Sequence, residues 1–102
     1  MKRLPKPKIT EADITRQIRQ CLDMYGIFHW KQWQGPMSQP KGVSDIIGIY
    51  YGRFLAIEIK KPGGALTPMQ AAFIMKVNAH GGIGFMATSV NDVIERLNAI
   101  KT

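Results

Sequence analysis

Two apolar runs separated by only three residues constrain the fold of this chain more than any other feature. Residues 43–50 are apolar almost throughout, apart from Ser44 and Asp45, and residues 54–60 form a second such run. Short runs that are rich in isoleucine and bounded by turn residues are typical of buried strands. Tyr51 and Gly52 between them favour a tight turn, so the two runs predict a β-hairpin.

Helices and further strands are predicted on both sides of this hairpin. Residues 11–25 carry apolar side chains at helical spacing and follow a capping-box pair, Thr10 and Asp13. Residues 67–80 begin with a second such pair, Thr67 and Gln70, and end at two glycines. The remaining expected elements are strands at 27–33 and 83–87, a loop at 34–42, and a last helix capped by Ser89 and Asp92. The order α-β-β-β-α-β-α predicts an α/β fold in which helices pack on a sheet.

The chain is basic, and its cations are unevenly distributed. Fourteen Lys and Arg against seven Asp and Glu give a formal net charge of +7. This charge favours a polyanionic partner, nucleic acid before an anionic membrane, because Lys and Arg release counterions from phosphates. We expect residues 1–9 to form a basic, extended arm before a single domain at 10–102, and without the arm the formal charge is +3. The cations of the arm are Lys2, Arg3, Lys6 and Lys8.

Other totals exclude several classes of protein. A single cysteine, Cys21, excludes an internal disulfide framework. No apolar run reaches the length of a membrane span, and the first residues lack the apolar core of a signal peptide. A soluble intracellular protein is therefore expected. With 102 residues, dimerisation is the simplest way to widen a surface for a large substrate.

The predicted hairpin brings two carboxylates together. If Tyr51 and Gly52 form a two-residue turn, counting back along both strands places Asp45 directly opposite Glu58. Opposed residues have Cβ atoms only about 4.5–5.5 Å apart, and like charges there are destabilising. Lys60 projects from the same face, two residues after Glu58. A hard divalent cation is the natural occupant, since Mg²⁺ is typically held by one or two carboxylates plus substrate phosphate.

Structural explanations of these residues stay open. A two-residue turn prefers Asn or Gly where Tyr51 stands, and a bulged three-residue loop would shift the pairing. Asp45 could cap a turn, while Glu58 and Lys60 could form an exposed pair on an edge strand. Both acids lie within apolar runs, however, and central apolar strands rarely carry carboxylates without a reason. We therefore favour the functional interpretation.

Glu11 and Gln70 are further candidates for the site. Glu11 shares the core-facing stripe of the first predicted helix and could reach the metal site as a ligand, directly or through water. The alternative is a first-turn acid that the helix dipole favours. For Gln70 the capping box is a sufficient role, and a contact with the site or substrate would be additional.

Four residues around the proposed site are candidates for DNA contacts. Lys41, Arg53 and Lys61 flank it and could contact phosphates, with a solvated charge as the alternative. Gly63 would let a phosphate backbone approach closely, or would merely form a turn.

Aromatic side chains near residue 30 allow two interpretations. Trp30 and Trp33 could stack on bases, but in a small domain aromatic residues more often belong to the core or an interface. His29, His80 and Cys21 are expected to be structural, because none has a metal-ligand partner at a recognised spacing.

The order of these motifs resembles a known group of nucleases. Gly42-Val43-Ser44-Asp45 followed by Ile57-Glu58-Ile59-Lys60 resembles the PD-(D/E)XK nuclease signature, with Ser44 where the superfamily's name places Pro. The continuation Lys61-Pro62-Gly63, with Leu66-Thr67-Pro68-Met69-Gln70, looks like the VRR-NUC family within it. The upstream helix bearing Glu11 fits this pattern, so the resemblance covers roughly residues 10–88.

This resemblance implies a restriction-endonuclease-like core with a mixed β-sheet flanked by helices, and Mg²⁺- or Mn²⁺-dependent phosphodiester hydrolysis. Asp45, Glu58 and the backbone carbonyl of Ile59 would bind the metal, Glu11 would assist, and Lys60 would orient water or stabilise charge. Stand-alone members, often of phage origin, are similar to Holliday-junction resolvases that act as homodimers. Branched DNA, a role in DNA repair or recombination, and the cytoplasm of a bacterium or phage-infected host are therefore implied.

Rival functions remain open at this point. A nuclease without junction specificity, or one that cuts flaps, is the nearest alternative. A basic DNA-binding module without catalysis and a protein-interaction domain belong to different classes. Opposed acids with a lysine argue against binding alone, because phosphate contacts do not need carboxylates.

Overall fold

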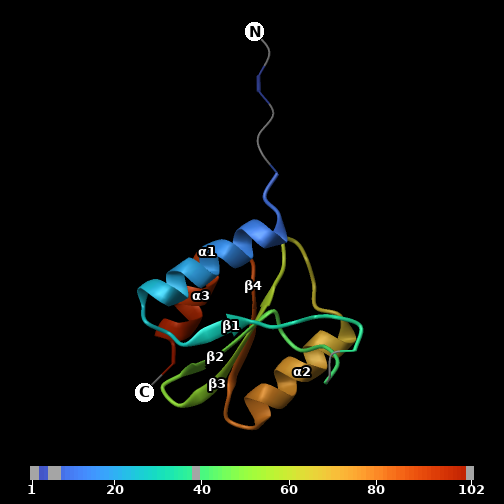
Figure 1. Cartoon of the computed structure of the whole chain (residues 1–102), viewed down its shortest axis with the longest axis vertical. Coiled ribbons are helices and arrows are strands. Elements are labelled where there is room, and N and C mark those ends of the chain that lie inside the picture. Colours follow the sequence, from blue (N-terminus) through green and yellow to red (C-terminus); the bar gives the residue numbers. More distant parts are fainter. Residues whose placement is uncertain (1–2, 5–7, 38–39, 101–102) are drawn as a thin grey trace.

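The computed structural model describes residues 3–4, 8–37 and 40–100, which form three helices and four strands (Figure 1). The elements are α1 (Glu11–Met24), β1 (His29–Lys31), β2 (Ile46–Tyr50), β3 (Arg53–Ile59), α2 (Pro68–Ala79), β4 (Ile83–Ala87) and α3 (Val90–Asn98). This order confirms the predicted α/β class. Of the predicted basic arm, Arg3 and Lys8 are exposed, whereas Lys2 and Lys6 lie outside the described residues.

The strands form one mixed sheet in the order β1-β2-β3-β4. β2 pairs antiparallel with both β1 and β3, whereas β3 and β4 run parallel. A parallel pair needs a crossover connection, and α2 supplies it. In the described part of the chain β1 is therefore an edge strand next to the hairpin β2–β3.

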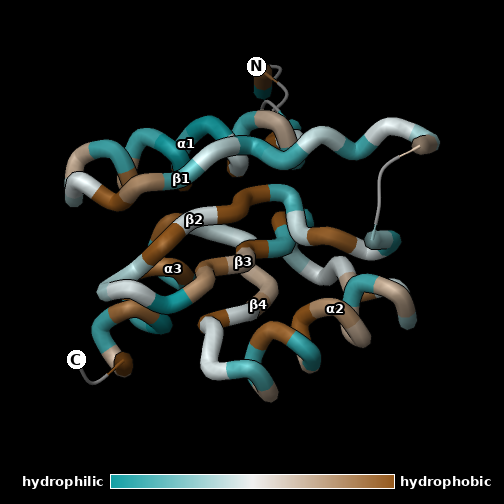
Figure 2. The backbone as a smooth tube through the Cα atoms, turned by 60° about the horizontal axis from the view of Figure 1, so that its bottom comes forward, coloured by the Kyte–Doolittle hydropathy of each residue, from teal (hydrophilic) through white to brown (hydrophobic). Residues whose placement is uncertain are grey.

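Helices cover the two faces of this sheet unequally (Figures 1 and 2). On one face, α1 and α3 bury Ile14, Ile18 and Val93 against the strands. The opposite face carries a smaller cluster, in which Ile47 and Ala56 meet side chains of α2. α2 lies close to β4, because a Cβ on Gly84 would be only 3.2 Å from the carbonyl oxygen of Ile74. Neither cluster contacts the exposed side of α1, which is largely hydrophilic (Figure 2).

Side-chain caps begin the helices where the sequence predicts them. Thr10 and Asp13 form a complete capping box at α1, and Thr67 with Gln70 forms another at α2. Ser89 accepts a hydrogen bond from the Asp92 N–H at α3. These bonds satisfy backbone N–H groups that have no partner within the helix. No helix within residues 8–37 and 40–100 has both the length and the apolar character needed to cross a membrane.

Two predicted strands are shorter than expected. The strand predicted at 27–33 spans only His29–Lys31, although a hydrogen bond from Gln32 N to Asp45 O extends the contact with the β2 segment. The run at 43–50 enters the sheet only at Ile46, so Asp45 precedes the strand. The physical reason lies in the loop, where the Gln34 side-chain amide donates to the Val43 carbonyl at 2.8 Å in place of a strand partner.

The hairpin turn has the predicted two residues. Tyr50 pairs with Arg53, and the register continues without a bulge to Ile46 opposite Ile57. Tyr51 and Gly52 have φ angles of 49° and 76°, the combination that a type I′ turn requires. Tyr51 is an unusual residue at this position, and its ring meets the Tyr50 ring edge-on at 4.7 Å.

Candidate functional site

Asp45 and Glu58 meet at the end of the hairpin farthest from its turn. The last ladder pair is Ile46 with Ile57, so the two acids do not face each other as paired strand residues. Instead, the Asp45 carboxylate accepts a hydrogen bond from the backbone N–H of Ile59 at 2.7 Å. Asp45 and Glu58 are therefore close, as predicted, but the reason is different. The Asp45 carboxylate accepts the hydrogen bond from Ile59 N–H that a backbone carbonyl would accept if the ladder continued.

Strand alternation puts the acids on the face of the sheet that bears α2. Ile47 pairs with Ala56, and both belong to the cluster that α2 covers. Glu58 lies two residues after Ala56 on the same strand, and therefore on the same face. Lys60 follows two residues later, and its backbone N–H donates to Ala87 of β4 at 3.1 Å.

Glu58 is a buried carboxylate with incomplete hydrogen bonding. Its exposure is 3%, and no hydrogen-bond donor within the described residues reaches its Oε2 atom. The Lys60 ammonium lies 4.0 Å from Glu58 Oε1 and is itself mostly buried. A single lysine cannot neutralise two carboxylates, so the site favours a further positive charge.

The electrostatics of the pair follow from burial and proximity. Burial raises the pKa of Glu58 to about 8, and the neighbouring Asp45 charge acts in the same direction. Burial also raises the pKa of Asp45, whereas the Ile59 N–H and a hydrogen bond with Glu58 oppose that rise. Because both carboxyl groups resist ionisation together, a cation that binds between them would relieve the conflict.

Glu11 is exposed at the first position of α1, not part of the core-facing stripe. That part of the prediction is wrong, because the buried stripe begins at Ile14. The Glu11 charge contributes to raising the pKa of Asp45, and a role for Glu11 as a metal ligand stays a prediction.

Lys60 is positioned by the turn that follows β3. The Gly64 N–H donates to the Lys61 carbonyl at 2.9 Å, closing a turn in which Gly63 has a φ of 86°. A Cβ on Gly64 would lie 3.1 Å from the Lys60 Cβ and 3.0 Å from the Lys61 oxygen. Gly64 thus leaves room for the lysine stem.

The Gln70 side chain serves the helix cap. The side-chain Oε1 of Gln70 accepts a hydrogen bond from the Thr67 backbone N–H at 2.9 Å. The backbone N–H of Gln70 donates to the Thr67 hydroxyl at 3.2 Å. The same turn of α2 packs against Gly42, since a Cβ there would collide with the Met69 carbonyl. Gln70 thus helps to fix the loop before Asp45, and none of its hydrogen bonds to described residues involves a site carboxylate.

The four candidate DNA-contacting residues occupy different parts of the molecule. Arg53 does not flank the site: it begins β3 at the hairpin turn, and its guanidinium donates to the carbonyls of Gly81 and Gly82. The prediction overlooked that a strand of seven residues separates its two ends by about 20 Å. Lys61 is exposed beside the site, and Lys41 is exposed in the preceding loop, where it donates to Pro36 O. For Gly63 the positive φ is a sufficient explanation.

The histidines and the cysteine have structural surroundings. Nδ1 of His29 lies 2.8 Å from the Ile27 carbonyl, and Nδ1 of His80 lies 2.8 Å from the Lys76 carbonyl. Cys21 is buried on α1. The two tryptophans are exposed, at 41% for Trp30 and 61% for Trp33, so neither belongs to the core, and a role at an interface or in base stacking stays a prediction.

The carboxylate oxygens of Asp45 and Glu58 suit a hard divalent cation. Glu58 offers a buried oxygen without a partner, and Asp45 lies beside it. Carboxylate oxygens are the preferred ligands of Mg²⁺, which keeps several waters and needs few protein ligands. No cluster of three or more His, Cys, Asp or Glu side chains within residues 3–4, 8–37 and 40–100 is arranged to bind a metal. The remaining ligands would have to be backbone carbonyls, water or substrate.

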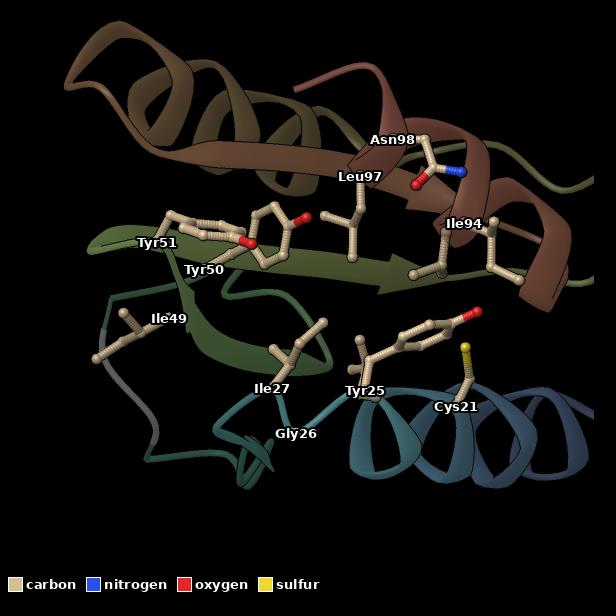
Figure 3. A pocket seen from close by; sticks show the side chains of 12 residues that line it. Cys21, Tyr25, Gly26, Ile27, Ile49, Tyr50, Tyr51, Ile94, Leu97 and Asn98 are labelled. Atoms are coloured by element: carbon tan, nitrogen blue, oxygen red, sulfur yellow. The ribbon is translucent and has the colours of Figure 1, made fainter. Parts of the chain in front are cut away.

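A separate cavity of about 380 Å³ opens at the other end of the sheet (Figure 3). It lies between the end of α1, the β2–β3 turn and α3, and none of the residues that line it is charged. Tyr25, Tyr50 and Leu97 are among them (Figure 3). This cavity is remote from Asp45 and Glu58, and no carboxylate, imidazole or lysine side chain lines it.

Comparisons with known proteins add no family assignment. The chain matches no protein-family model, and none of the curated proteins matches it.

Proposed function

We propose that this protein is a Mg²⁺- or Mn²⁺-dependent DNA endonuclease with a restriction-endonuclease-like core, similar to the VRR-NUC family. The buried Glu58 carboxyl beside Asp45 carries this proposal. Burying two acids together is costly unless a cation or another function compensates. The mixed sheet with helices on both faces is compatible with such a core.

The residues of the site suit metal-assisted hydrolysis of a phosphodiester. Asp45 and Glu58 would hold the cation, with the Ile59 carbonyl as a further ligand, and Glu11 would assist directly or through water. A bound Mg²⁺ would supply Lewis-acid polarisation of the scissile phosphate and a lower pKa for water. Lys60, fixed by Gly64, would hold a water molecule or donate to the phosphate oxygens as negative charge develops there.

Branched DNA, in particular a four-way junction cut by a homodimer, is the substrate we propose. The support is the motif resemblance together with the formal charge of +7. Two active sites related by a two-fold axis match the symmetry of such a junction. A flap-type or non-specific nuclease is the alternative, and the same residues would act in it. The resemblance also suggests a bacterial or phage-infected cytoplasm as the place of action.

Cleavage of synthetic DNA tests the proposal. A labelled four-way junction, a flap and a linear duplex of equal length are incubated with Mg²⁺, Mn²⁺ or EDTA. We expect metal-dependent cleavage that is fastest on the junction; equal rates on all three substrates would remove the junction preference.

Variants separate catalysis from binding in this assay. Asp45→Asn should abolish cleavage and retain DNA binding, because the phosphate contacts of Lys and Arg remain. Lys60→Ala should lower the rate by about 10²–10³-fold, as for other losses of one charge-stabilising donor. Arg53→Ala, whose partners lie at the far turn, is the matched control and should cleave like the parent. Mn²⁺ that fails to bind the parent protein in calorimetry would favour a non-catalytic module.

A further inference from the structure

The sheet face that carries Asp45 and Glu58 is only partly covered. α2 packs over β3 and β4, and leaves aromatic and aliphatic side chains near β1, on β2 and at the start of β3 in contact with solvent. The exposed fractions are 65% for Phe28, 41% for Trp30, 47% for Ile49 and 45% for Phe54. Exposed apolar side chains that are grouped in this way usually mark a binding surface.

Strand alternation puts two of these aromatic rings on the face of the site. Trp30 pairs with Ile47, which α2 touches on that face, and Phe28 precedes Trp30 by two residues. The rings of Phe28 and Trp30 lie 5.7 Å apart at 56°. On this edge strand they form a short aromatic row.

Gln32 connects the aromatic row to the carboxylates. The Trp30 indole donates to Gln32 Oε1 at 3.1 Å, which fixes the orientation of the ring. The Gln32 backbone N–H in turn donates to the Asp45 carbonyl at 2.8 Å. Trp30 and Gln32 are two residues apart on the strand, a span of about 6.6 Å. This length is close to that of two stacked base steps, each about 3.4 Å. The row therefore begins within a few nucleotides of the proposed metal site.

The charge around the row is suited to a polyanion. Residues 24–44 contain Lys31 and Lys41 and no Asp or Glu. Both lysines are exposed: Lys41 lies in the loop before Asp45, whereas Lys31 lies on the other face of β1, beside α1. Exposed aromatic rings in a segment without acids, on a chain with a formal charge of +7, match the combination by which proteins bind single-stranded nucleic acid.

We propose that Phe28 and Trp30, oriented by Gln32, form a stacking platform for unpaired bases next to the scissile phosphate. Bases inside a duplex are already stacked on each other, so only unpaired or splayed bases can use the platform. This inference rests on the proposed nuclease function and deepens it: the enzyme selects DNA that exposes unpaired nucleotides beside the cleavage point. A continuous, fully paired duplex is bound through phosphates alone.

Tryptophan fluorescence measures this contact directly, because the chain contains only two tryptophans. Trp33→Phe leaves Trp30 as the only reporter. This variant is titrated in EDTA with a thymidine dodecamer, an abasic strand of equal length and a blunt duplex. We expect quenching by the thymidine strand alone, since bases stack on the ring while phosphates do not.

Substitution of the platform gives the second measurement. Trp30→Leu should weaken binding of the thymidine strand by about 5- to 100-fold, the effect of losing one stacked base, and leave duplex binding unchanged. Tyr25→Leu is the matched control, because Tyr25 is 68% exposed but caps α1 outside the row. Equal loss on strand and duplex, or equal quenching by the abasic strand, would overturn the platform.

The alternative occupant of this surface is a second copy of the chain. Sedimentation of the parent and of Trp30→Leu detects it: a dimer that Trp30→Leu dissociates would assign the row to a protein interface. Because the titrations contain no divalent metal, they do not depend on cleavage. If the protein stacks bases but does not cleave DNA, the platform is supported and the nuclease proposal is wrong. If it cleaves DNA but does not stack bases, the nuclease proposal is supported and the platform is wrong.

Discussion

The proximity of Asp45 and Glu58 lowers the stability of the protein without a metal, and the same proximity favours a bound cation. Each is a carboxyl group whose ionised form is disfavoured by burial and by the other acid. Under the proposed function, the same arrangement that costs stability without a metal would provide the affinity for a divalent cation. The hydrogen bond that Asp45 accepts from Ile59 N holds the Asp45 carboxylate beside Glu58.

The first prediction concerns the pH dependence of the metal-free protein. The pKa of Glu58 is raised from 4.5 to about 8, so the folded state binds more protons than the unfolded state between these values. Its contribution to the free energy of unfolding is therefore complete below about pH 4.5 and lost as the pH rises through about 8. Urea unfolding in EDTA should show lower stability at pH 8 than at pH 5.

The control for this prediction is Glu58→Gln, which cannot ionise and should flatten the dependence. Mn²⁺ added to the parent at pH 8 should restore stability, because the cation replaces the proton. Parent and variant profiles of equal slope would show that Glu58 does not titrate in this range.

The second prediction concerns Gly64 and the position of Lys60. Gly64→Ala adds a Cβ 3.1 Å from the Lys60 Cβ and should displace the ammonium. We expect cleavage to slow by about 10- to 100-fold, as for small misplacements of a catalytic group. Gly63→Ala is the comparison: its Cβ would meet open space, but the positive φ should cost about 1 kcal/mol of stability. Single-turnover rates and thermal melts measure the two effects. If Gly63→Ala slows cleavage and Gly64→Ala only lowers the melting temperature, Gly64 does not position Lys60.

At the scale of elements, the loop before β2 and the first turn of α2 support each other. Gly42 packs against the backbone of this turn, and the capping box of Thr67 and Gln70 fixes its N–H groups. Asp45 follows Gly42 by three residues, so the order of the α2 cap helps to position the site. The hairpin contributes the other half of the geometry through its bulge-free register.

The third prediction separates capping from catalysis at Gln70. Gln70→Ala removes one half of the capping box and should lower stability by roughly 0.5–1 kcal/mol while cleavage stays near the parental rate. Gln70→Glu can form the same reciprocal bond and should restore the melting temperature. If both variants lose cleavage and keep their melting temperatures, Gln70 acts on the substrate.

At the scale of the whole molecule, basic charge and the uncovered sheet face point to the same kind of partner. Asp45 and Glu58 lie at one end of the hairpin, Lys41 and Lys61 are exposed in the loops beside it, and four further cations are in the first eight residues. The uncharged cavity at the opposite end has no part in this arrangement (Figure 3). DNA binding should therefore depend strongly on salt.

The fourth prediction assigns part of that salt dependence to the arm. Replacing Lys2, Arg3, Lys6 and Lys8 with Gln should reduce the slope of log affinity against log salt by up to about 3.6, at about 0.9 for each duplex phosphate contact. The cleavage rate at saturating DNA should not change, since the site residues are intact. An unchanged slope in fluorescence anisotropy titrations would exclude contacts between the arm and DNA.

Local patterns in the sequence determined most of the secondary structure. The helix caps, the apolar runs and the two-residue turn depend on neighbours in the chain, so the element order and the Tyr50–Arg53 register could be read from it. The grouping of Asp45, Glu58 and Lys60 followed from that register and from strand alternation.

Tertiary structure alone decided how these elements cover one another. The sequence does not show that α2 leaves the face of β1 exposed, that Arg53 reaches the carbonyls of Gly81 and Gly82, or that Asp45 bonds to Ile59 N. Burial of Glu58 and exposure of Trp30 both depend on which strands the helices cover. That coverage depends on contacts between residues far apart in the chain, such as Gly84 with Ile74 and Gly42 with Met69, which no local pattern specifies.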